Sequence, residues 1–528
     1  MKRIAIRCYP LLLLLLAACA PHRHDDKMIF RYNESSGIAT LDPAFARDQS
    51  IIWPCRQLYN GLVQLDTMLA VQPAIAKRWT ISSDGLEYTF TLRDDVMFHD
   101  PVNRVVTAYD FEYSFNRIVD TTSPSPGAWI FSDVESWRAV DDTTFTIRLR
   151  HSFAPFLGEL GMVYCSVVPH EEVERWGKDF RSHPCGTGPF KFQYWKEGVK
   201  LVLRKNPNYF ERDEEGRRLP YLDAVAVTFI IDKQTLFLEF VKGNLDFMNS
   251  LDASYKDEIL TPAGTLKEKY APRIDMVSTP YLNTEYLGFD MEDTRSPLHD
   301  RRLRQAINYG FDRKKMMCYL RNNVGLAGVG GFVPVGLPGF DTLATYGYDY
   351  DPQRALRLLA EAGYPGGKGL PTLKLATTAG YLDLCKYLQQ QLGLLGIHID
   401  VDVNPPAALR EQMAQGKSQW FRGSWVADYP DAENYLMLFH AANRTPAGPN
   451  YTRFRDARVD RLYESLRKES DDARRSALCR EMDSLVMSEA PVVVLYYDQI
   501  LHFTHKNVSG LRSNAMNNLD LRRVRIVK

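Results

Sequence analysis

The fold is decided by the segment that begins Pro371-Thr372-Leu373-Lys374-Leu375-Ala376-Thr377 and ends at Val403. Its opening run reads as a strand, and leucines at helical spacing follow at positions 384, 388, 392 and 395. Polar residues then alternate with four branched apolar ones, Ile397, Ile399, Val401 and Val403, as they do in strands. A strand, a helix and a strand within about 35 residues predict a βαβ unit and hence a parallel sheet. The section after residue 281 is therefore expected to be α/β.

The N-terminal half carries patterns typical of antiparallel strands. Asp84-Gly85 is a turn signal, and the residues from Tyr88 to Arg93 after it alternate between apolar and polar. The residues from Phe145 to Leu149 alternate in the same way. A mature chain of about 500 residues is too long for one core, and its length suggests two to four domains. The sequence thus predicts two lobes with mixed sheets.

The first 27 residues predict that the protein is exported from the cytoplasm. Lys2, Arg3 and Arg7 precede an apolar run from Leu11 to Leu16, and small residues follow it. This order is typical of a secretory signal peptide, and the run is shorter than the ~20 residues that span a bilayer. Leu16-Ala17-Ala18-Cys19 looks like the lipobox of bacterial lipoproteins, which implies cleavage before Cys19 and acylation of that cysteine. The alternative is an ordinary signal peptide with a chance cysteine. Residues 19–27 read as a lipidated tether.

Charge and cysteine content bear on the possible partners of the chain and on its disulfides. Lys and Arg together number 65, as do Asp and Glu, so no basic surplus favours nucleic acid as a partner. Of the eight cysteines, six lie beyond the signal and the lipobox. An even number in an oxidising compartment permits disulfides. Cys165 and Cys185 are near neighbours and form the candidate pair, while buried free thiols are the alternative.

Several motifs follow one another in order over nearly the whole mature chain. They include Leu41-Asp42-Pro43, Gly186-Thr187-Gly188-Pro189-Phe190, Arg302-Leu303-Arg304-Gln305-Ala306-Ile307, Leu358-Leu359-Ala360-Glu361-Ala362-Gly363-Tyr364 and Gly423-Ser424-Trp425-Val426-Ala427-Asp428-Tyr429-Pro430-Asp431. In these motifs the chain resembles the peptide/nickel-type solute-binding proteins of ABC importers, a class that includes oligopeptide and dipeptide binders.

The resemblance implies an α/β, two-lobed periplasmic-binding-protein-like fold with mixed sheets and an extra inserted subdomain. Residues 1–18 would be the signal peptide. Lobe I would comprise residues 28–66, 186–280 and 498–528, with the subdomain 67–185 inserted in it. Lobe II would comprise residues 281–497. Most of the matched motifs, such as Gly186 to Phe190, would shape the scaffold and leave ligand contact to others.

The resemblance also implies a binding site. A peptide's α-ammonium in a closed cleft has lost its water, and the unpaired charge costs several kcal/mol. In the family, the acid of the Trp-x-Ala-Asp-Tyr motif pairs with it, and Asp428 matches that acid. Ser424 and Val426 match positions whose main chain pairs with the peptide as an added strand does. Trp425 and Tyr429 would form walls of the pocket. The alternative for Asp428 is a turn acid that caps a local backbone N–H.

The sequence says less about the residues that would contact the rest of the peptide and its C-terminal carboxylate. By ungapped count, Arg47-Asp48-Gln49 falls where the family's first lobe meets the ligand. The residue types differ from those of oligopeptide binders, so main-chain contacts alone carry over to Asp48 and Gln49, and a surface loop is the alternative. Trp129 faces either the cleft or the core. For the ligand's carboxylate, Arg313, Arg422 and Arg444 are available, and no motif selects one.

We therefore expect a lipoprotein on the periplasmic or cell-surface face of a bacterial membrane. It would capture peptides between its lobes and deliver them to the permease of an ABC transporter, as a monomer without cofactor or metal. Motifs of metalloproteases and serine hydrolases are absent from the sequence. Two alternatives stay open. The same fold could bind a nickel-chelate, an opine or a sugar, or the chain could be a tethered extracytoplasmic sensor or hydrolase.

Overall fold

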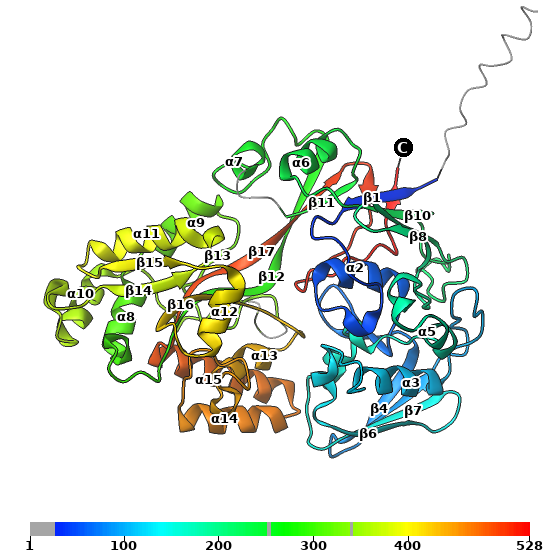
Figure 1. The fold of residues 1–528 in the computed structure, drawn as a ribbon, viewed down its shortest axis with the longest axis horizontal. Coiled ribbons are helices and arrows are strands. Elements are labelled where there is room, and N and C mark those ends of the chain that lie inside the picture. The colour runs from blue at the N-terminus through cyan, green and yellow to red at the C-terminus, as the bar shows by residue number, and fades with distance from the viewer. Residues whose placement is uncertain (1–26, 251–254, 338–339, 341, 528) are drawn as a thin grey trace, which may run out of the picture.

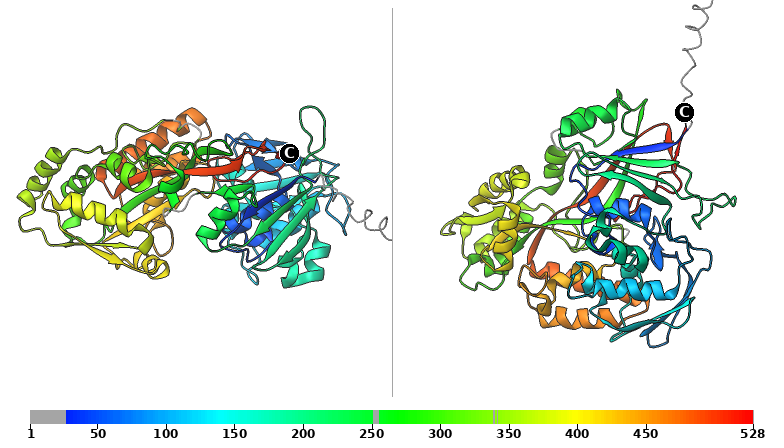
Figure 2. Two further views of the ribbon diagram at one scale, coloured as in Figure 1. Left: turned by 90° about the horizontal axis from the view of Figure 1, so that it is seen from above. Right: turned by 45° about the vertical axis from the view of Figure 1, so that its right-hand side comes forward.

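The structure is a computed structural model that describes residues 27–250, 255–337, 340 and 342–527. The expected signal peptide and Cys19 lie outside these residues. The chain folds into two halves, which two long strands connect (Figure 1). The views of Figure 2 show the same division from two further sides. The expected α/β, two-lobed class with mixed sheets is confirmed.

The first half contains two four-stranded sheets. One has the order β1-β10-β9-β8 and comprises β1 (Ile29–Asn33), β10 (Ala224–Thr228), β9 (Lys200–Lys205) and β8 (Phe190–Lys196). The other is antiparallel in the order β4-β5-β7-β6 and comprises β4 (Ala76–Ile81), β5 (Glu87–Leu92), β7 (Thr144–Leu149) and β6 (Val134–Ala139). The antiparallel strands predicted around Tyr88 and Phe145 are thus β5 and β7, which pair directly.

The second half is built on a seven-stranded mixed sheet. Its strands are β11 (Phe247–Asn249), β17 (Val492–His505), β12 (Ile274–Phe289), β16 (Trp420–Val426), β14 (Leu373–Thr377), β15 (Ile399–Val403) and β13 (Leu326–Ala327). The parallel pairing of β14 with β15, joined by helix α11 (Leu382–Gly393), confirms the predicted βαβ unit. Two short pairs complete the strands: β2 (Val63–Leu65) with β3 (Val71–Pro73), and β18 (Val508–Ser509) with β19 (Arg525–Ile526).

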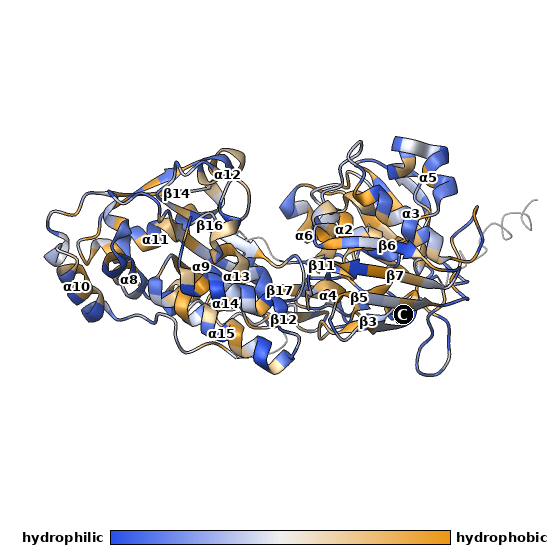
Figure 3. Ribbon diagram, turned by 90° about the horizontal axis from the view of Figure 1, so that it is seen from below, coloured by the Kyte–Doolittle hydropathy of each residue, from blue (hydrophilic) through white to orange (hydrophobic). Residues whose placement is uncertain are grey.

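Helices cover these sheets. The first half has α2 (Gln49–Leu58), α3 (Ala108–Ile118), α4 (Phe156–Leu160) and α5 (His170–Trp176). The helices α6 (Lys233–Val241) and α7 (Lys256–Ile259) pack against β11 and one end of β12 and β17. The second half has α8 (Arg301–Tyr309), α9 (Arg313–Arg321), α10 (Pro352–Glu361), α12 (Pro406–Ala414), α13 (Glu433–Leu436), α14 (Ala457–Lys468) and α15 (Asp472–Glu489) besides α11. Peripheral helices such as α5 are mostly hydrophilic (Figure 3). Within the described ranges, no helix has the length and apolar character needed to cross a membrane.

The two halves are connected by the antiparallel ribbon of β12 and β17 (Figure 1). These strands pair from Ile274 with His505 to Gly288 with Val492, with register shifts between Pro280 and Thr284 and again after Glu285. The lobe limits predicted at 281 and 498 fall inside these two strands. The crossing between the halves is therefore a continuous ribbon and not a loop.

The predicted Cys165–Cys185 disulfide is wrong, because both cysteines are free and buried. Cys165 belongs to the apolar core around β5 and β7, and its thiol points to the carbonyl of Glu159 at 3.8 Å. Cys185 belongs to the core beneath β8 and β9, and its thiol points to the carbonyl of His99 at 3.5 Å. Nearness in sequence does not bring their Cβ atoms together, as a disulfide requires.

A buried acid holds the segment around Phe332 and Tyr346 that precedes α10. Asp483, on α15, accepts hydrogen bonds from the backbone N–H of Phe332 at 2.8 Å and from the Tyr346 hydroxyl at 2.8 Å. Burial raises the pKa of Asp483 to about 6, against the opposing effect of these hydrogen bonds. The native state therefore holds a proton between about pH 4 and pH 6 that the unfolded chain has lost.

We predict that the folded protein loses stability as the pH rises from about 4 to about 6, because Asp483 then has to give up this proton inside the core. The loss is at most about 3 kcal/mol in the free energy of unfolding. The asparagine of Asp483→Asn cannot ionise. Between pH 4 and pH 7 the free energy of unfolding of the variant should therefore rise by that amount relative to the wild type. Urea unfolding at both pH values measures the difference. Asp472→Asn, which changes an exposed acid of the same helix, controls for net charge. A wild-type to variant difference that does not change with pH would contradict this prediction.

Candidate ligand-binding site

A cavity of about 320 Å³ lies between the two halves of the molecule. The first half contributes the segment from Ala46 to Ile52, together with Arg56, Trp129 and residues 162–164. The second half contributes Tyr281 and the segment from Val426 to Asp428, and the C-terminal return adds Met516 and Asn518. Its size is within the range of pockets that bind small molecules. Segments that are far apart in the sequence thus meet at one site.

Asp428 lies at the end of β16, where the chain leaves the large sheet. Its main-chain N–H donates to the Asn434 side-chain oxygen at 3.1 Å, and the Asn434 amide donates to its carboxylate at 3.4 Å. The side chain is accessible from the cavity, yet the surrounding protein desolvates it enough to raise the pKa of its carboxyl, against the Asn434 hydrogen bond. In the described part of the chain, Asp428 has no Lys or Arg within ion-pair distance. The carboxylate therefore faces the cavity without a cation.

The strand that leads to Asp428 has an open edge. β16 pairs with β12 along its length, but with β14 at Phe421 alone. The N–H of Ala427 donates to the Leu282 carbonyl of β12, and hydrogen-bonding direction alternates along a strand. The main-chain groups of Ser424 and Val426 therefore point away from β12, toward the open edge. They are placed where an extended ligand could add a strand.

Trp425 and Tyr429 lie behind the cavity wall and not at its surface. The Trp425 indole N–H donates to Asn434 at 3.0 Å, and the ring packs against the core of the second half. Tyr429 is buried, and its hydroxyl donates to the carboxylate of Glu433. Trp129, by contrast, borders the cavity, and its ring lies 6.0 Å from that of Tyr429. This ring contact joins the two halves beside the cavity.

Asp48 and Gln49 border the cavity. Asp48 is the residue before α2, and Gln49 is the first residue of the helix. The Asp48 carboxylate pairs with Arg47 at 3.3 Å, and both side chains are exposed. The Gln49 amide donates to the Asn517 carbonyl at 2.7 Å. Both side chains are thus already engaged within the protein, which agrees with the expectation that main-chain contacts alone carry over.

The three arginines considered for a ligand carboxylate lie outside the cavity lining. Arg313 is buried and donates to the carbonyls of Val494 and Asn308. Arg422 pairs with the buried Glu285, and Arg444 pairs with the exposed Glu292. Each already has a partner in the second half.

Sequence reasoning missed several residues that line the cavity, among them Arg56, Tyr164 and Tyr281. For Arg56 a signal was present, because Gln49, Ile52 and Arg56 stand at positions i, i+3 and i+7 of one helix and share a face. All three border the cavity. The two tyrosines follow no spacing rule that links them to Asp428. No group of three or more metal-ligating side chains is present among the residues with described positions.

Comparison with known proteins identifies the family of the chain. The family described as "Bacterial extracellular solute-binding proteins, family 5 Middle" matches residues 70–446, which is well over half of the chain. The chain belongs to this family of solute-binding proteins.

Named relatives match this solute-binding protein over almost its full length. It is 26% identical to di/tripeptide-binding protein 2 of Pseudomonas aeruginosa, with 99% of each chain covered. It is also 26% identical to the glutathione-binding protein of Salmonella typhimurium, with 90% of each chain covered. Among solved structures, the periplasmic binding protein DppA of Helicobacter pylori in complex with the peptide STSA matches at a TM-score of 0.76 and 24% identity. That match covers 95% of this chain and 99% of DppA, and it supports the fold alone.

Proposed function

We propose that this solute-binding protein captures short peptides by their free N-terminus between its two halves and delivers them to an ABC transporter permease. One observation carries the proposal: the Asp428 carboxylate faces the interlobe cavity without a cation of its own. A peptide's α-ammonium supplies the missing charge. The open edge at Ser424 and Val426 supplies main-chain partners that do not depend on the peptide's side chains.

Several further features support the same proposal. The names of two relatives specify di- and tripeptides and glutathione, which are small peptides. The cavity takes walls from both halves, so a bound ligand would stabilise the arrangement in which the halves meet. The lipobox at Cys19 would tether the protein by lipid to the outer face of a membrane, where a permease could receive the ligand. The lobe limits given above are part of this proposal.

Native mass spectrometry of the protein purified from its host tests the function directly. We expect a mass increment that matches one short peptide or a mixture of them, released on denaturation. We also expect the protein's own mass to correspond to a chain that begins at an acylated Cys19. A co-purified metal chelate, opine or sugar would contradict the peptide proposal while it left the binding role in place. Hydrolysis of added peptide would contradict the binding role itself.

A further inference from the structure

A second charged side chain in the cleft has no oppositely charged partner among the described residues. Arg56 lies in the last turn of α2 and borders the interlobe cavity. It also borders a neighbouring cavity of about 160 Å³. The two cavities share Arg56, Met162, Val163 and Asn518. Arg56 therefore stands where the cleft continues toward the C-terminal segment of the chain.

The guanidinium of Arg56 makes one hydrogen bond, from Nη2 to the Gly161 carbonyl at 3.3 Å. Its Nε is buried and has no hydrogen-bond partner. Across the residues that the structure describes, no carboxylate lies within ion-pair distance of it. Burial and the nearby charge of Arg522 lower the pKa of Arg56 to about 10, so it still carries its charge at neutral pH. A buried N–H without an acceptor is costly, and a ligand carboxylate beside the guanidinium would supply an acceptor.

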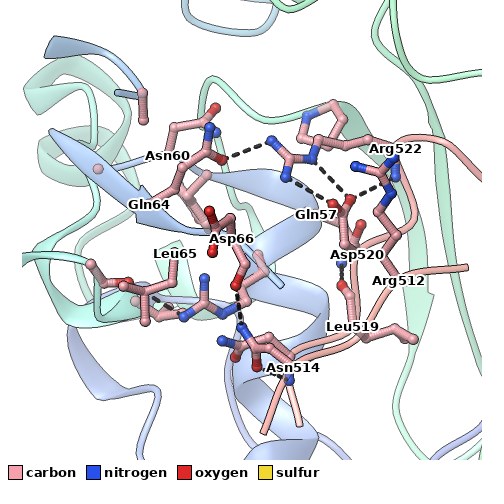
Figure 4. A pocket seen from close by; sticks show the side chains of 18 of the residues that line it. Gln57, Asn60, Gln64, Leu65, Asp66, Arg512, Asn514, Leu519, Asp520 and Arg522 are labelled. Atoms are coloured by element: carbon pink, nitrogen blue, oxygen red, sulfur yellow. Dashed lines mark hydrogen bonds and ion pairs between the residues drawn. The ribbon is translucent and has the colours of Figure 1, made fainter. Parts of the chain in front are cut away.

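Two of the other arginines around the two cavities, Arg522 and Arg47, already have carboxylate partners. Arg522 pairs with Asp520 at 2.8 Å and with Glu211 at 2.6 Å, and it donates to Gln64. Figure 4 shows Arg522, Asp520 and Gln64 together on the wall of the second cavity. Asp520, an acid that lines the second cavity, is thus already paired with Arg522 and forms no ion pair with Arg56. Arg47, on the rim of the interlobe cavity, pairs with Asp48.

Among the described residues, two side chains of opposite charge that border the interlobe cavity therefore have no ion-pair partner. Asp428 comes from the second half and Arg56 from the first, and both border the same space. They form no ion pair with each other, so their atoms lie farther apart than ion-pair distance. A ligand that satisfies both must carry a cation at one end and an anion at the other. A short peptide with free termini is such a molecule.

We propose that Arg56 binds the C-terminal carboxylate of the captured peptide, and that the ligand is a short peptide with both termini free. This inference rests on the proposed function, because it assumes that Asp428 holds the N-terminus. It adds the requirement of a free C-terminal carboxylate, which binding of the N-terminus by Asp428 does not impose. Capture through the N-terminus and the main chain would tolerate any C-terminus, whereas an ion pair with Arg56 selects the free acid.

The test compares one peptide in three forms: with free termini, with a C-terminal amide and with an acetylated N-terminus. The peptide is the one identified from the purified protein or, failing that, trialanine. Isothermal titration calorimetry measures affinities for wild type, Arg56→Gln, Arg56→Lys and Arg47→Gln, after thermal unfolding has shown that each variant folds. Arg47→Gln is the matched control, because it removes another arginine of the same cavity.

We expect wild type and Arg47→Gln to prefer the free acid over the amide by about 10- to 100-fold, the range for hydrogen bonds to a charged group. Arg56→Gln should bind both forms equally, with little change for the amide, and should still reject the acetylated peptide. Arg56→Lys should keep part of the preference. An unchanged preference in Arg56→Gln, or no preference in wild type, would overturn the assignment of Arg56 while leaving Asp428 in place. Failure of wild type to bind any of the three forms would overturn both proposals.

Discussion

Replacing Asp428 with asparagine should weaken the binding of short peptides by about 100-fold or more. The substitution keeps the shape of the side chain and its contact with Asn434, but removes the negative charge from the cavity. The peptide's ammonium would then enter the cleft without a counter-charge. Truncating one partner of a desolvated, hydrogen-bonded charge pair costs about 2–5 kcal/mol. Calorimetry on wild type and variant measures the ratio of the dissociation constants.

Asp48→Asn is the matched control for this substitution. Asp48 is an acid on the wall of the same cavity, but it is exposed and pairs with Arg47. Its side chain makes no capping hydrogen bond to α2, so the substitution removes none. The control should bind peptides within a few-fold of wild type. If Asp428→Asn and Asp48→Asn weakened binding equally, the cavity's overall charge would explain the effect and the specific clamp would be wrong.

Replacing Gly188 with alanine should destabilise the first half of the molecule by about 3 kcal/mol. A Cβ at this position would lie 2.4 Å from the Leu58 carbonyl carbon and 2.5 Å from the Gln57 carbonyl oxygen. These are backbone atoms at the end of α2, which cannot yield as a flexible side chain can. The same segment holds the helix end through the hydrogen bond from Gly188 N–H to the Leu58 carbonyl at 2.9 Å. The free energy of unfolding in urea measures the loss.

Gly380→Ala controls for the effect of adding a methyl group to the chain. A Cβ at Gly380 meets no atom within 4 Å and requires no unusual backbone angle. That variant should unfold within about 0.5 kcal/mol of wild type. Because α2 carries Gln49 and Arg56, we also expect the folded Gly188→Ala protein to lose peptide affinity. Equal stability of the two variants would show that the helix end can move away from this segment.

The sequence allowed much of the fold to be predicted, because local patterns carry it. The alternation from Ile397 to Val403 and the leucine stripe before it are properties of single elements, and β14, α11 and β15 follow them. The lobe limits stay a prediction. β12 and β17 run through both predicted limits without a break, so no change of element marks where one lobe ends.

Residues that border the cavity could be named from the sequence where one segment carries them, and they were missed where the fold assembles them. Asp428 and the open strand edge before it belong to a single continuous motif. Arg56 could have been found from its helical spacing with Gln49, but its lack of a partner is a property of the folded cavity. Trp425 and Tyr429 have the residue types of a pocket wall, yet their polar atoms are held by Asn434 and Glu433 behind it. No local pattern shows which face of an aromatic ring the ligand would meet.

The most direct test of the ammonium clamp compares a free peptide with its N-acetylated form in one calorimetric titration series. Acetylation removes the positive charge and keeps the rest of the peptide. The clamp predicts that wild type binds the free form about 100-fold more tightly, and that Asp428→Asn abolishes this difference. Equal affinity of wild type for the two forms would contradict the central claim that Asp428 binds a peptide's N-terminus.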